Sequence, residues 1–420
     1  MFEYSKILLL ALVLYGCLYF LLPELFLHFL GLGSWKRHYS PGVSLTFDDG
    51  PDPIYTVKLL DILEKHRIKA CFFLVGEKAE QHPDLTKKIL EKGHQIGTHG
   101  YLHKHAWLLS PTKTWYYWNE SIRILKKIVG SEPEFIRPPW GGFNLALFIW
   151  ALVKKKKIIM WSVKAFDWKK NRTPSDIVNT IIKNSAEGGI ILLHDSGGEI
   201  GAPTNTLLCL EKLIKKLKTE LKLPVVPLKI PEWPLFRRLI YRLWQKWEKA
   251  YANWKNIRRI DDQSLFRLAL VKYKGPNLVN EWGQILAEKG DLIGEIHFDN
   301  SRFPSMDTDT KNIGISALKK VRFSLPILAN YVARNPDFKS VNVYLGVTML
   351  NKGAKNLGFS VQEYPFKDGR LIAALQKILI KIYHPLGAKR KTAKLGFKPK
   401  LVWITRDQLL KKYYKTKKTN

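Results

Sequence analysis

The sequence predicts an α/β fold with a parallel sheet, followed by a second, smaller α/β or α+β domain. The chain has 420 residues, which is long for one hydrophobic core and sufficient for two. In the first half, apolar runs of strand length alternate with segments of helical periodicity, the pattern of a parallel sheet with crossover helices. We expect strands at 43–47, 70–76, from 95 and 190–193, helices at 56–67, 84–92 and 207–218, a last strand at 223–228, and a domain boundary at 224–234.

The composition describes a basic, folded protein. The formal net charge is +33, and because 46% of the residues are hydrophobic, the chain is not a disordered basic tail. This charge suggests anionic surroundings, such as cell-wall polymer, anionic lipid or nucleic acid. The sequence has no zinc-finger spacing and no Gly-rich phosphate loop, so no nucleic acid is expected as a partner. The cysteines Cys17, Cys71 and Cys209 are too scattered for a disulfide framework.

Residues 1–33 are predicted to form an uncleaved membrane anchor. The segment 7–22 is almost wholly apolar and the apolar run resumes at 25–32, so the two together are long enough to cross a bilayer. No small-x-small cleavage site of a signal peptide precedes the globular part. Pro23 and Glu24 interrupt the run, which leaves a buried hairpin of helices as the alternative.

Two adjacent carboxylates, Asp48 and Asp49, follow the apolar strand 43–47. Side chains alternate along a strand, so the two carboxylates diverge, and one can face a metal while the other faces a substrate. Chemistry in α/β folds gathers at the carboxyl ends of strands, which favours a cation site here. The alternative is a solvated turn, because Asp-Gly-Pro is ordinary turn chemistry.

His99 and His103 lie four residues apart, directly after another predicted strand. On a helical turn, that spacing puts both imidazoles on one side, as a metal clamp requires. With Asp49 they form a His₂-carboxylate set that leaves positions open for water and substrate. Such a set suits a divalent metal, Zn²⁺ first, with Co²⁺ or Mn²⁺ as alternatives. His105 is a candidate third ligand or an outer partner, and a structural role is the alternative for each histidine.

Three further patches end predicted strands, namely RPPWG at 137–141, FDW at 166–168 and LLHD at 192–195. An arginine beside a rigid proline turn can hold a carboxylate bidentately. Taken singly, each patch has a structural explanation: a proline turn, a helix cap with a core tryptophan, or a buried strand. Five such patches at strand ends in one α/β frame favour a common active site.

These residues resemble the polysaccharide deacetylases with a NodB-type domain, the carbohydrate esterase family 4. The resemblance covers about residues 42–230 and rests on TFDDGPD (46–52), HGYLH (99–103), RPPWG (137–141), FDW (166–168) and LLHD (192–195). It implies a distorted (β/α)₇ barrel and metal-dependent removal of an N- or O-acetyl group from a sugar. Two positions depart from the family pattern: Gly100 stands where Ser or Thr is usual, and Lys164 replaces the first acid of DxxDW. Neither is a ligand or a proton carrier.

The resemblance also implies the role of each residue. The metal ligands are Asp49, His99 and His103. The proton carriers are Asp48 as general base and His194 as general acid. Arg137 orients Asp48, and Asp167 tunes Arg137 or His194. The residues at the substrate are Pro139, Trp140, Trp168 and Leu192, with the backbone N–H of Trp140 on the oxyanion. The chemistry of amide hydrolysis agrees: a metal polarises the carbonyl, a base takes the proton of water, and an acid protonates the leaving amine.

Residues 231–262 are predicted to form a basic amphipathic linker helix. Its apolar stripe consists of Phe236, Ile240, Leu243, Trp247, Tyr251 and Trp254, and Arg and Lys cover the other faces. A helix of this kind suits an anionic membrane surface. It equally suits a linker packed between two domains.

Residues 263–420 resemble the YkoP-type domain found downstream of some bacterial deacetylases. We expect a helix at 314–334, strands at 341–347 and 358–361, and a basic tail from Lys389 that is solvated or binds a polymer. Alternation places Glu295, His297 and Asp299 on one face of a strand. This face is either a second polar or metal site, or the outer face of a solvent-exposed edge strand.

The sequence therefore predicts a single-pass protein of the cell membrane whose catalytic domain, 40–230, is a metal-dependent carbohydrate deacetylase facing the cell wall. The expected partner is an acetylated polysaccharide, peptidoglycan first, with chitin- or xylan-like oligomers as alternatives. One basic residue, Lys6, precedes the anchor, and two, Lys36 and Arg37, follow it. Because basic residues favour the cytoplasmic side, this difference weakly favours a cytoplasmic catalytic domain. The rival hypotheses are a lapsed enzyme that only binds sugar and a binder of membrane surfaces or anionic polymers.

Overall fold

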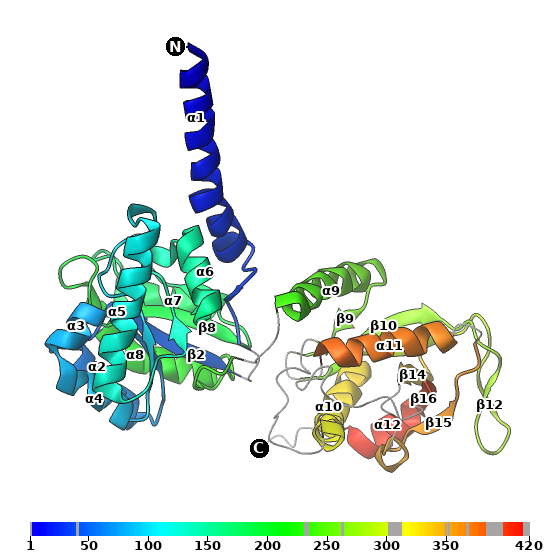
Figure 1. Ribbon diagram of the computed structural model, residues 1–420. Coiled ribbons are helices and arrows are strands. Elements are labelled where there is room, and N and C mark those ends of the chain that lie inside the picture. Colours follow the sequence, from blue (N-terminus) through cyan, green and yellow to red (C-terminus); the bar gives the residue numbers. More distant parts are fainter. Residues whose placement is uncertain are drawn as a thin grey trace. The chain divides into compact units, whose positions relative to one another are not determined.

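The computed structural model describes residues 2–38, 42–230, 235–261, 264–300, 313–348, 351, 353–366, 369–383 and 398–414. Its contacts divide the chain into two compact units, Met1–Leu235 and Phe236–Asn420, which are described separately (Figure 1). The division follows directly after the Pro-rich stretch 224–234, whose last four residues lie outside the described part.

An eight-stranded, wholly parallel sheet organises the first unit. Its strands lie in the order β1-β6-β5-β4-β3-β2-β8-β7. They are β1 (Ser34–Trp35), β2 (Val43–Asp48), β3 (Cys71–Leu74), β4 (Gln95–Thr98), β5 (Phe135–Ile136), β6 (Lys157–Ile159), β7 (Val163–Lys164) and β8 (Gly189–His194). The predicted parallel α/β fold is confirmed. This curled sheet, which stays open between β1 and β7 in the described residues, is the distorted barrel implied by the resemblance.

Helices connect the strands and cover the sheet, as Figure 1 shows. They are α2 (Tyr55–Lys65), α3 (Gly76–Gln81), α4 (Pro83–Glu91), α5 (Pro111–Val129), α6 (Leu145–Val153), α7 (Pro174–Asn184) and α8 (Ala202–Thr219). The central strands β2, β3 and β8 are buried nearly throughout, which explains why their sequences are continuous apolar runs. One core cluster packs these strands against α2, α7 and α8, and a second packs the other half of the sheet against α5 and α6.

The strand predicted at 70–76 is confirmed as β3 but is shorter: it ends at Leu74, because Gly76 already begins α3 and its N–H donates to the carbonyl of Gly100 (2.8 Å). The last strand predicted at 223–228 is wrong, because this segment forms one bridge, from Val225 to Val43. Strand β1 was not predicted, because two residues are too few to show a pattern of alternation.

The N-terminal segment changes character halfway. Helix α1 (Phe2–Gly16) is exposed along its described side chains, which does not fit a buried hairpin. The helical segments η1 (Cys17–Leu21) and η2 (Glu24–Phe29) instead contact the unit, and Leu27 is only 1% exposed. The range Tyr4–Phe29 is long and apolar enough to cross a membrane, with a mean hydropathy of 2.1. The second half of the expected anchor is thus also part of the core.

The second unit contains a six-stranded mixed sheet in the order β15-β16-β14-β13-β10-β9. The strands are β9 (Arg258–Arg259), β10 (Phe266–Lys272), β13 (Leu292–Phe298), β14 (Val343–Thr348), β15 (Ser360–Glu363) and β16 (Lys400–Thr405), with a separate pair β11 (Leu278–Val279) and β12 (Ile285–Ala287). The helices are α9 (Leu235–Trp254), α10 (Ile313–Arg334), α11 (Gly369–Tyr383) and α12 (Arg406–Tyr413). The predicted helix at 314–334 and strands at 341–347 and 358–361 are confirmed.

The edge-strand interpretation of 295–299 is wrong, because β13 lies between β10 and β14 in the middle of the sheet. Asp299 just after β13 is fully buried and pairs with Arg267 (2.5 Å) and Arg259 (2.8 Å). Its neighbour His297 lies 3.4 Å from Glu295. Among the described residues, one group has the spacing of metal ligands, and it consists of Asp49, His99 and His103 in the first unit. The polar face is therefore an ion-pair network.

Two further segments of this unit correct or refine the predictions. The basic tail is only partly a solvated surface where it is described: 400–405 forms the internal strand β16, whereas Lys398, Lys411 and Lys412 on either side of it are exposed. Positions 389–397 and 415–420 lie outside the described residues. Helix α9 exposes the predicted apolar stripe, with Phe236 at 73% and Trp254 at 75% exposed, while Tyr241 between them is buried. The helix belongs by its contacts to the second unit.

Candidate metal centre and active site

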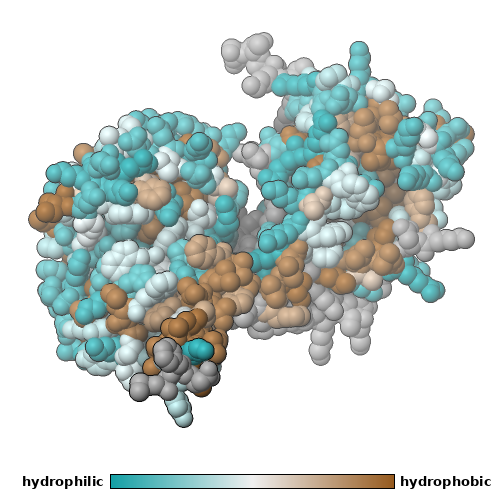
Figure 2. All heavy atoms as spheres, turned by 90° about the horizontal axis from the view of Figure 1, so that it is seen from above, coloured by the Kyte–Doolittle hydropathy of each residue, from teal (hydrophilic) through white to brown (hydrophobic). Residues whose placement is uncertain are grey.

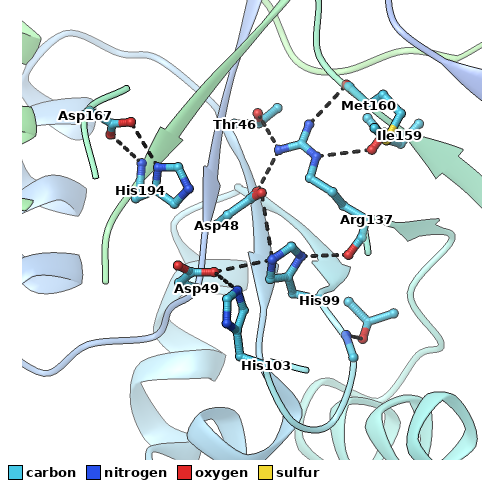
Figure 3. A network of polar contacts seen from close by, with 12 residues as sticks. Thr46, Asp48, Asp49, His99, His103, Arg137, Ile159, Met160, Asp167 and His194 are labelled. Carbon is cyan, nitrogen blue, oxygen red and sulfur yellow. Dashed lines mark hydrogen bonds and ion pairs between the residues drawn. The ribbon is translucent and has the colours of Figure 1, made fainter. Parts of the chain in front are cut away.

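The five sequence patches meet at the carboxyl edge of the parallel sheet (Figure 3). Asp48 ends β2, His99 follows β4, and Arg137 follows β5. Asp167 comes three residues after β7, and His194 ends β8. Strands that run in one direction present their carboxyl ends at one edge, which is why patches far apart in sequence come together here.

Asp49, His99 and His103 form the predicted ligand set. Both imidazole Nε2 atoms face the same oxygen, Asp49 Oδ1, at 3.3 Å from His99 and 3.1 Å from His103. That oxygen is buried and has no hydrogen-bond partner among the described residues. His99 Nδ1 donates to the carbonyl of Arg137 (2.6 Å), which leaves Nε2 as the ligand nitrogen. Ligand atoms of all three residues within 4.8 Å of one another fit a divalent metal.

The charge of the set also fits a cation. Burial acts to raise the pKa of Asp49, but the contacts with His103 and His99 outweigh it and hold that pKa well below its usual value. Asp49 is therefore anionic, as a carboxylate that holds a metal must be. Lys78 Nζ donates to the backbone carbonyl of Asp49 (2.8 Å) and to Ser196 Oγ (2.7 Å), which fixes the loop that carries the ligand.

The two histidines are brought together by a loop and not by the predicted helical turn. Residues 99–105 follow β4 without helix. Gly100, the departure from Ser or Thr at this position, has φ +85°, a backbone conformation that favours glycine. The N–H of Glu77 donates to the carbonyl of Tyr101 (2.9 Å) and ties the loop to α3. His105 is not in the ligand set, because its Nδ1 accepts from the N–H of Trp107.

Arg137 holds Asp48 in place. The guanidinium is fully buried, and its Nη1 donates to Asp48 Oδ1 (2.6 Å) and Thr46 Oγ1 (2.8 Å). Two further donors reach the carbonyls of Ile159 (3.1 Å) and Met160 (3.3 Å). The second oxygen of Asp48 lies 4.0 Å from His99 Nε2, so the carboxylate stands beside the metal ligands without joining them.

Asp167 contacts His194 and, among the described contacts, not Arg137. Its Oδ1 lies 2.9 Å from His194 Nδ1, and its Oδ2 accepts from the backbone N–H of His194 (2.8 Å) and from Thr206 Oγ1 (2.9 Å). Burial disfavours the charged imidazole, but the Asp167 carboxylate outweighs burial and raises the pKa of His194 to about 9. This geometry keeps His194 protonated near neutral pH, as a general acid requires.

The residues predicted at the substrate divide into two kinds. Trp140 is 58% exposed, has φ +54° and lies with its ring 4.1 Å from that of His103. Trp168 lies 5.2 Å from the His194 ring. Pro139 and Leu192 are buried, Leu192 at 3% exposure. The tryptophans therefore flank the metal and acid positions, while the other two support them from within.

Sequence reasoning gave no role to Asp195, the last residue of LLHD. This carboxyl is 1% exposed, and Thr56 Oγ1 donates to it (2.5 Å). Burial raises the pKa of Asp195 to about 7. A Cβ at Gly50 would collide with it at 2.4 Å, so Asp195 packs directly against the turn after Asp48 and Asp49. The sequence feature that could have identified Asp195 is an acidic residue directly after a strand whose residues before His194 are all apolar or glycine.

Lys164, the other departure from the family pattern, is exposed and lies over the Phe166 ring (4.9 Å).

Comparisons with known proteins agree with the site. Family models match for polysaccharide deacetylase at residues 36–157 and for the YkoP domain at 237–413. A peptidoglycan-N-acetylglucosamine deacetylase of Bacillus cereus is 40% identical over 181 residues, which cover 42% of this chain and 64% of that protein. A second from the same organism is 36% identical over 180 residues, covering 42% of this chain and 82% of the relative. The chain thus spans slightly less than two thirds of the first relative.

Solved structures give similar matches. The Bc1960 peptidoglycan N-acetylglucosamine deacetylase shares 36% identity and covers 46% of this chain and 90% of its own, with a TM-score of 0.44. A carbohydrate esterase family 4 pseudoenzyme from Bacillus anthracis shares 26% identity and covers 46% of this chain and 66% of its own, with a TM-score of 0.42. With the extent of the match to the second Bacillus cereus relative, and with the five motifs gathered at one edge of the sheet, the chain belongs to the polysaccharide deacetylase family.

Proposed function

We propose that this protein is a metal-dependent deacetylase that hydrolyses the N-acetyl groups of peptidoglycan N-acetylglucosamine. The observation that carries the proposal is the convergence of three groups of side chains at one edge of the sheet: the Asp49–His99–His103 ligand set, the Asp48–Arg137 pair and the His194–Asp167 pair. A structure that only recognised sugar has no need of a fixed base and a protonated acid on either side of a metal site.

The ligand set would hold the metal through Asp49 Oδ1 and the two histidine Nε2 atoms, and Zn²⁺ suits this donor set best. When bound, such an ion polarises a carbonyl and lowers the pKa of water. Asp48, held in place by Arg137, accepts the proton of the attacking water. The backbone N–H of Trp140 donates to the oxygen on which negative charge develops.

His194 completes the reaction from the other side. Its Nδ1 faces Asp167, so Nε2 is the atom from which a proton passes to the departing amine nitrogen. Protonation of that nitrogen is required because an amide anion is a poor leaving group. Trp140 and Trp168 offer flat apolar faces on either side of this path, where a sugar ring can be oriented.

The relatives and the N-terminal segment support the proposed substrate and location. The relatives described above are named as peptidoglycan-N-acetylglucosamine deacetylases, which supports the same sugar for this chain. The range Tyr4–Phe29 supports a membrane anchor, and a wall substrate requires a catalytic unit outside the membrane. This argument outweighs the small bias of Lys36 and Arg37 over Lys6.

A substrate panel tests the proposal. The full-length protein, loaded with Zn²⁺, is incubated with peptidoglycan, N-acetylglucosamine oligomers and acetylated xylan, and acetate and free amine are measured. Release of both products in equal amounts from peptidoglycan, abolished by a chelator and restored by Zn²⁺, is expected. Acetate without amine identifies an O-acetyl substrate and contradicts the N-acetyl assignment. Stable metal binding with no product from any of the three contradicts the deacetylase itself.

A further inference from the structure

The N-terminal segment cannot cross a bilayer without bringing part of the catalytic unit to it. A helical span needs about 20 residues to cross the hydrocarbon layer. Because Glu3 and Lys6 are polar, a span that begins at Ile7 extends to about Phe26. The free helix α1 ends at Gly16. The remainder of the span must therefore come from η1 and the first half of η2, which lie against the catalytic unit.

The contacts of η1 show which part of the unit lies at this depth. Tyr19 OH donates to the carbonyl of Leu109 (3.2 Å) and is 5% exposed. The ring of Phe20 lies 5.7 Å from that of Trp107. The outer side of η1 and of the start of η2 remains apolar and exposed, with Leu18 at 46% and Leu21, Leu22, Leu25 and Phe26 also exposed. The loop 106–109 is thus level with residues of the span that face lipid.

The unit exposes apolar side chains at that level. Leu108 is 76% exposed, Trp107 43%, Ile149 43% and Leu145 36%. Asn144 Nδ2 donates to the carbonyls of Ala106 (2.7 Å) and Leu109 (3.4 Å), which joins the start of α6 to the loop. Figure 2 looks down on the first unit along α1 and shows hydrophobic side chains on this helix and around its base. Exposed apolar side chains that gather beside a span fit lipid better than water.

Glu24 is the one carboxylate in the range Tyr4–Phe29, and its side chain has polar partners within the described structure. Glu24 Oε2 accepts from the backbone N–H of Phe143 (2.8 Å), and Oε1 lies 2.7 Å from His28 Nδ1. A carboxylate near the bilayer is costly unless it is paired. This pairing also attaches the end of the span to the residues that follow the RPPWG motif.

We propose that the catalytic unit is seated in the surface of the lipid bilayer through a docking face formed by Trp107, Leu108, Leu145 and Ile149. The inference rests on the membrane insertion of Tyr4–Phe29 proposed above. We name the lipid bilayer as the partner of this face for two reasons. The face is continuous with an apolar span, and a span of about 20 residues brings the face to the level of the lipid.

The docking face adjoins the active site. Successive ring contacts run from Trp107 to His105 (5.8 Å), from His105 to Trp140 (5.8 Å) and from Trp140 to the metal ligand His103 (4.1 Å). A unit seated in this way holds the rim of its site beside the membrane surface. The acetylated glycan that it reaches is then the membrane-proximal one.

Lipid-phase quenching tests the docking face in the full-length chain. Cys17→Ala removes the partly exposed thiol, and the buried Cys71 and Cys209 stay. In this background, Leu108→Cys is compared with Leu90→Cys, each carrying an environment-sensitive fluorophore. Leu90 is 40% exposed at the end of α4, before β4, and so lies at the opposite edge of the sheet from the loop that follows β4. Both proteins are reconstituted into phosphatidylcholine–phosphatidylglycerol vesicles with and without a spin-labelled lipid.

The label at Leu108→Cys is expected to be quenched several-fold more than the label at Leu90→Cys, and to be blue-shifted. Equal quenching of the two labels, in protein that stays with the vesicles after alkaline washing, overturns the docking face while leaving the anchor intact. Protein that washes off the vesicles overturns the anchor and the docking face together. A blue shift without quenching at Leu108→Cys means burial in protein, and it also overturns the proposal.

Discussion

Arg137 Nη1 lies 2.6 Å from Asp48 Oδ1, and neither side chain is more than 4% exposed. The same guanidinium lies 4.1 Å from the centroid of the Phe73 ring and donates to two backbone carbonyls at the end of β6, those of Ile159 and Met160. Because every face of the arginine is occupied, Asp48 is held in one orientation beside the metal ligands. The position of Asp48, the proposed general base, is thus set by a residue 89 positions away in sequence.

Arg137→Lys is expected to lower kcat by about 10- to 100-fold, because a single ammonium cannot reproduce the fork of donors and Asp48 shifts by a fraction of an ångström. KM is expected to change little, since Arg137 is buried and touches no substrate. The measurement is steady-state acetate release, with melting curves to confirm the fold. Arg123→Lys is the matched control, because its pair with Glu120 is exposed. An unchanged kcat in folded Arg137→Lys contradicts the orienting role.

Asp167→Asn is expected to move the alkaline limb of kcat/KM toward lower pH. The carboxylate raises the pKa of His194 from 6.5 to about 9, so its removal lowers that pKa and the acid loses its proton earlier as the pH rises. The same pair stabilises the fold fully below pH 6.5, and this stabilisation is lost as the pH rises through about 9. A pH–rate profile and melting curves at several pH values measure both effects. An alkaline limb that stays in place would refute the assignment of His194.

His103→Ala is expected to lose metal, whereas His105→Ala retains it. His103 Nε2 lies 3.1 Å from Asp49 Oδ1 within the ligand set, but His105 Nδ1 accepts from a backbone N–H outside it. Loss of one of three protein ligands is expected to weaken metal binding by at least about 100-fold, more than the 10- to 100-fold typical of outer-sphere partners. Metal content after dialysis against a competing chelator measures the difference. Equal loss of metal from both variants would show that the ligand set is wrongly assigned.

Asp299→Asn is expected to destabilise the second unit without changing metal content. Asp299 is fully buried between Arg267 and Arg259, and removing the charge leaves two guanidinium groups poorly paired, at a cost of about 3 kcal/mol. Asp337→Asn is the control, because its pair with Arg258 is half exposed on both sides. Denaturant unfolding and metal analysis are the two measurements. A lower metal content in Asp299→Asn would contradict the ion-pair interpretation and support a second metal site at this strand.

The sequence allowed the site to be predicted because each motif ends a strand. Asp48 and His194 end apolar runs whose length and composition identify buried parallel strands, and parallel strands present their ends together. The spacing of His99 and His103 predicted that they act together but gave the wrong local structure. A glycine in the left-handed region brings the two rings together in a loop as well as a helical turn does.

Other parts required long-range contacts that periodicity does not contain. The alternation at Glu295 and His297 is the same for an edge strand and for a central strand with one polar face. The burial of Asp299 among arginines could therefore not be predicted from this pattern. The apolar stripe of α9 predicted a helix with two faces, but not which face packs on the domain. The attachment of Glu24 to Phe143 joins segments 119 residues apart and left no local pattern.

The central claim is tested most directly by acetate release from peptidoglycan by the native protein and Asp48→Asn at equal metal content. Asp48 lies beside the ligand set, 4.0 Å from His99 Nε2, without belonging to it. The substitution is therefore expected to keep the metal and to lower kcat by about 10²- to 10⁴-fold, the usual contribution of a general base. Native-like acetate release from metal-loaded Asp48→Asn would contradict the account, because the base would then lie elsewhere.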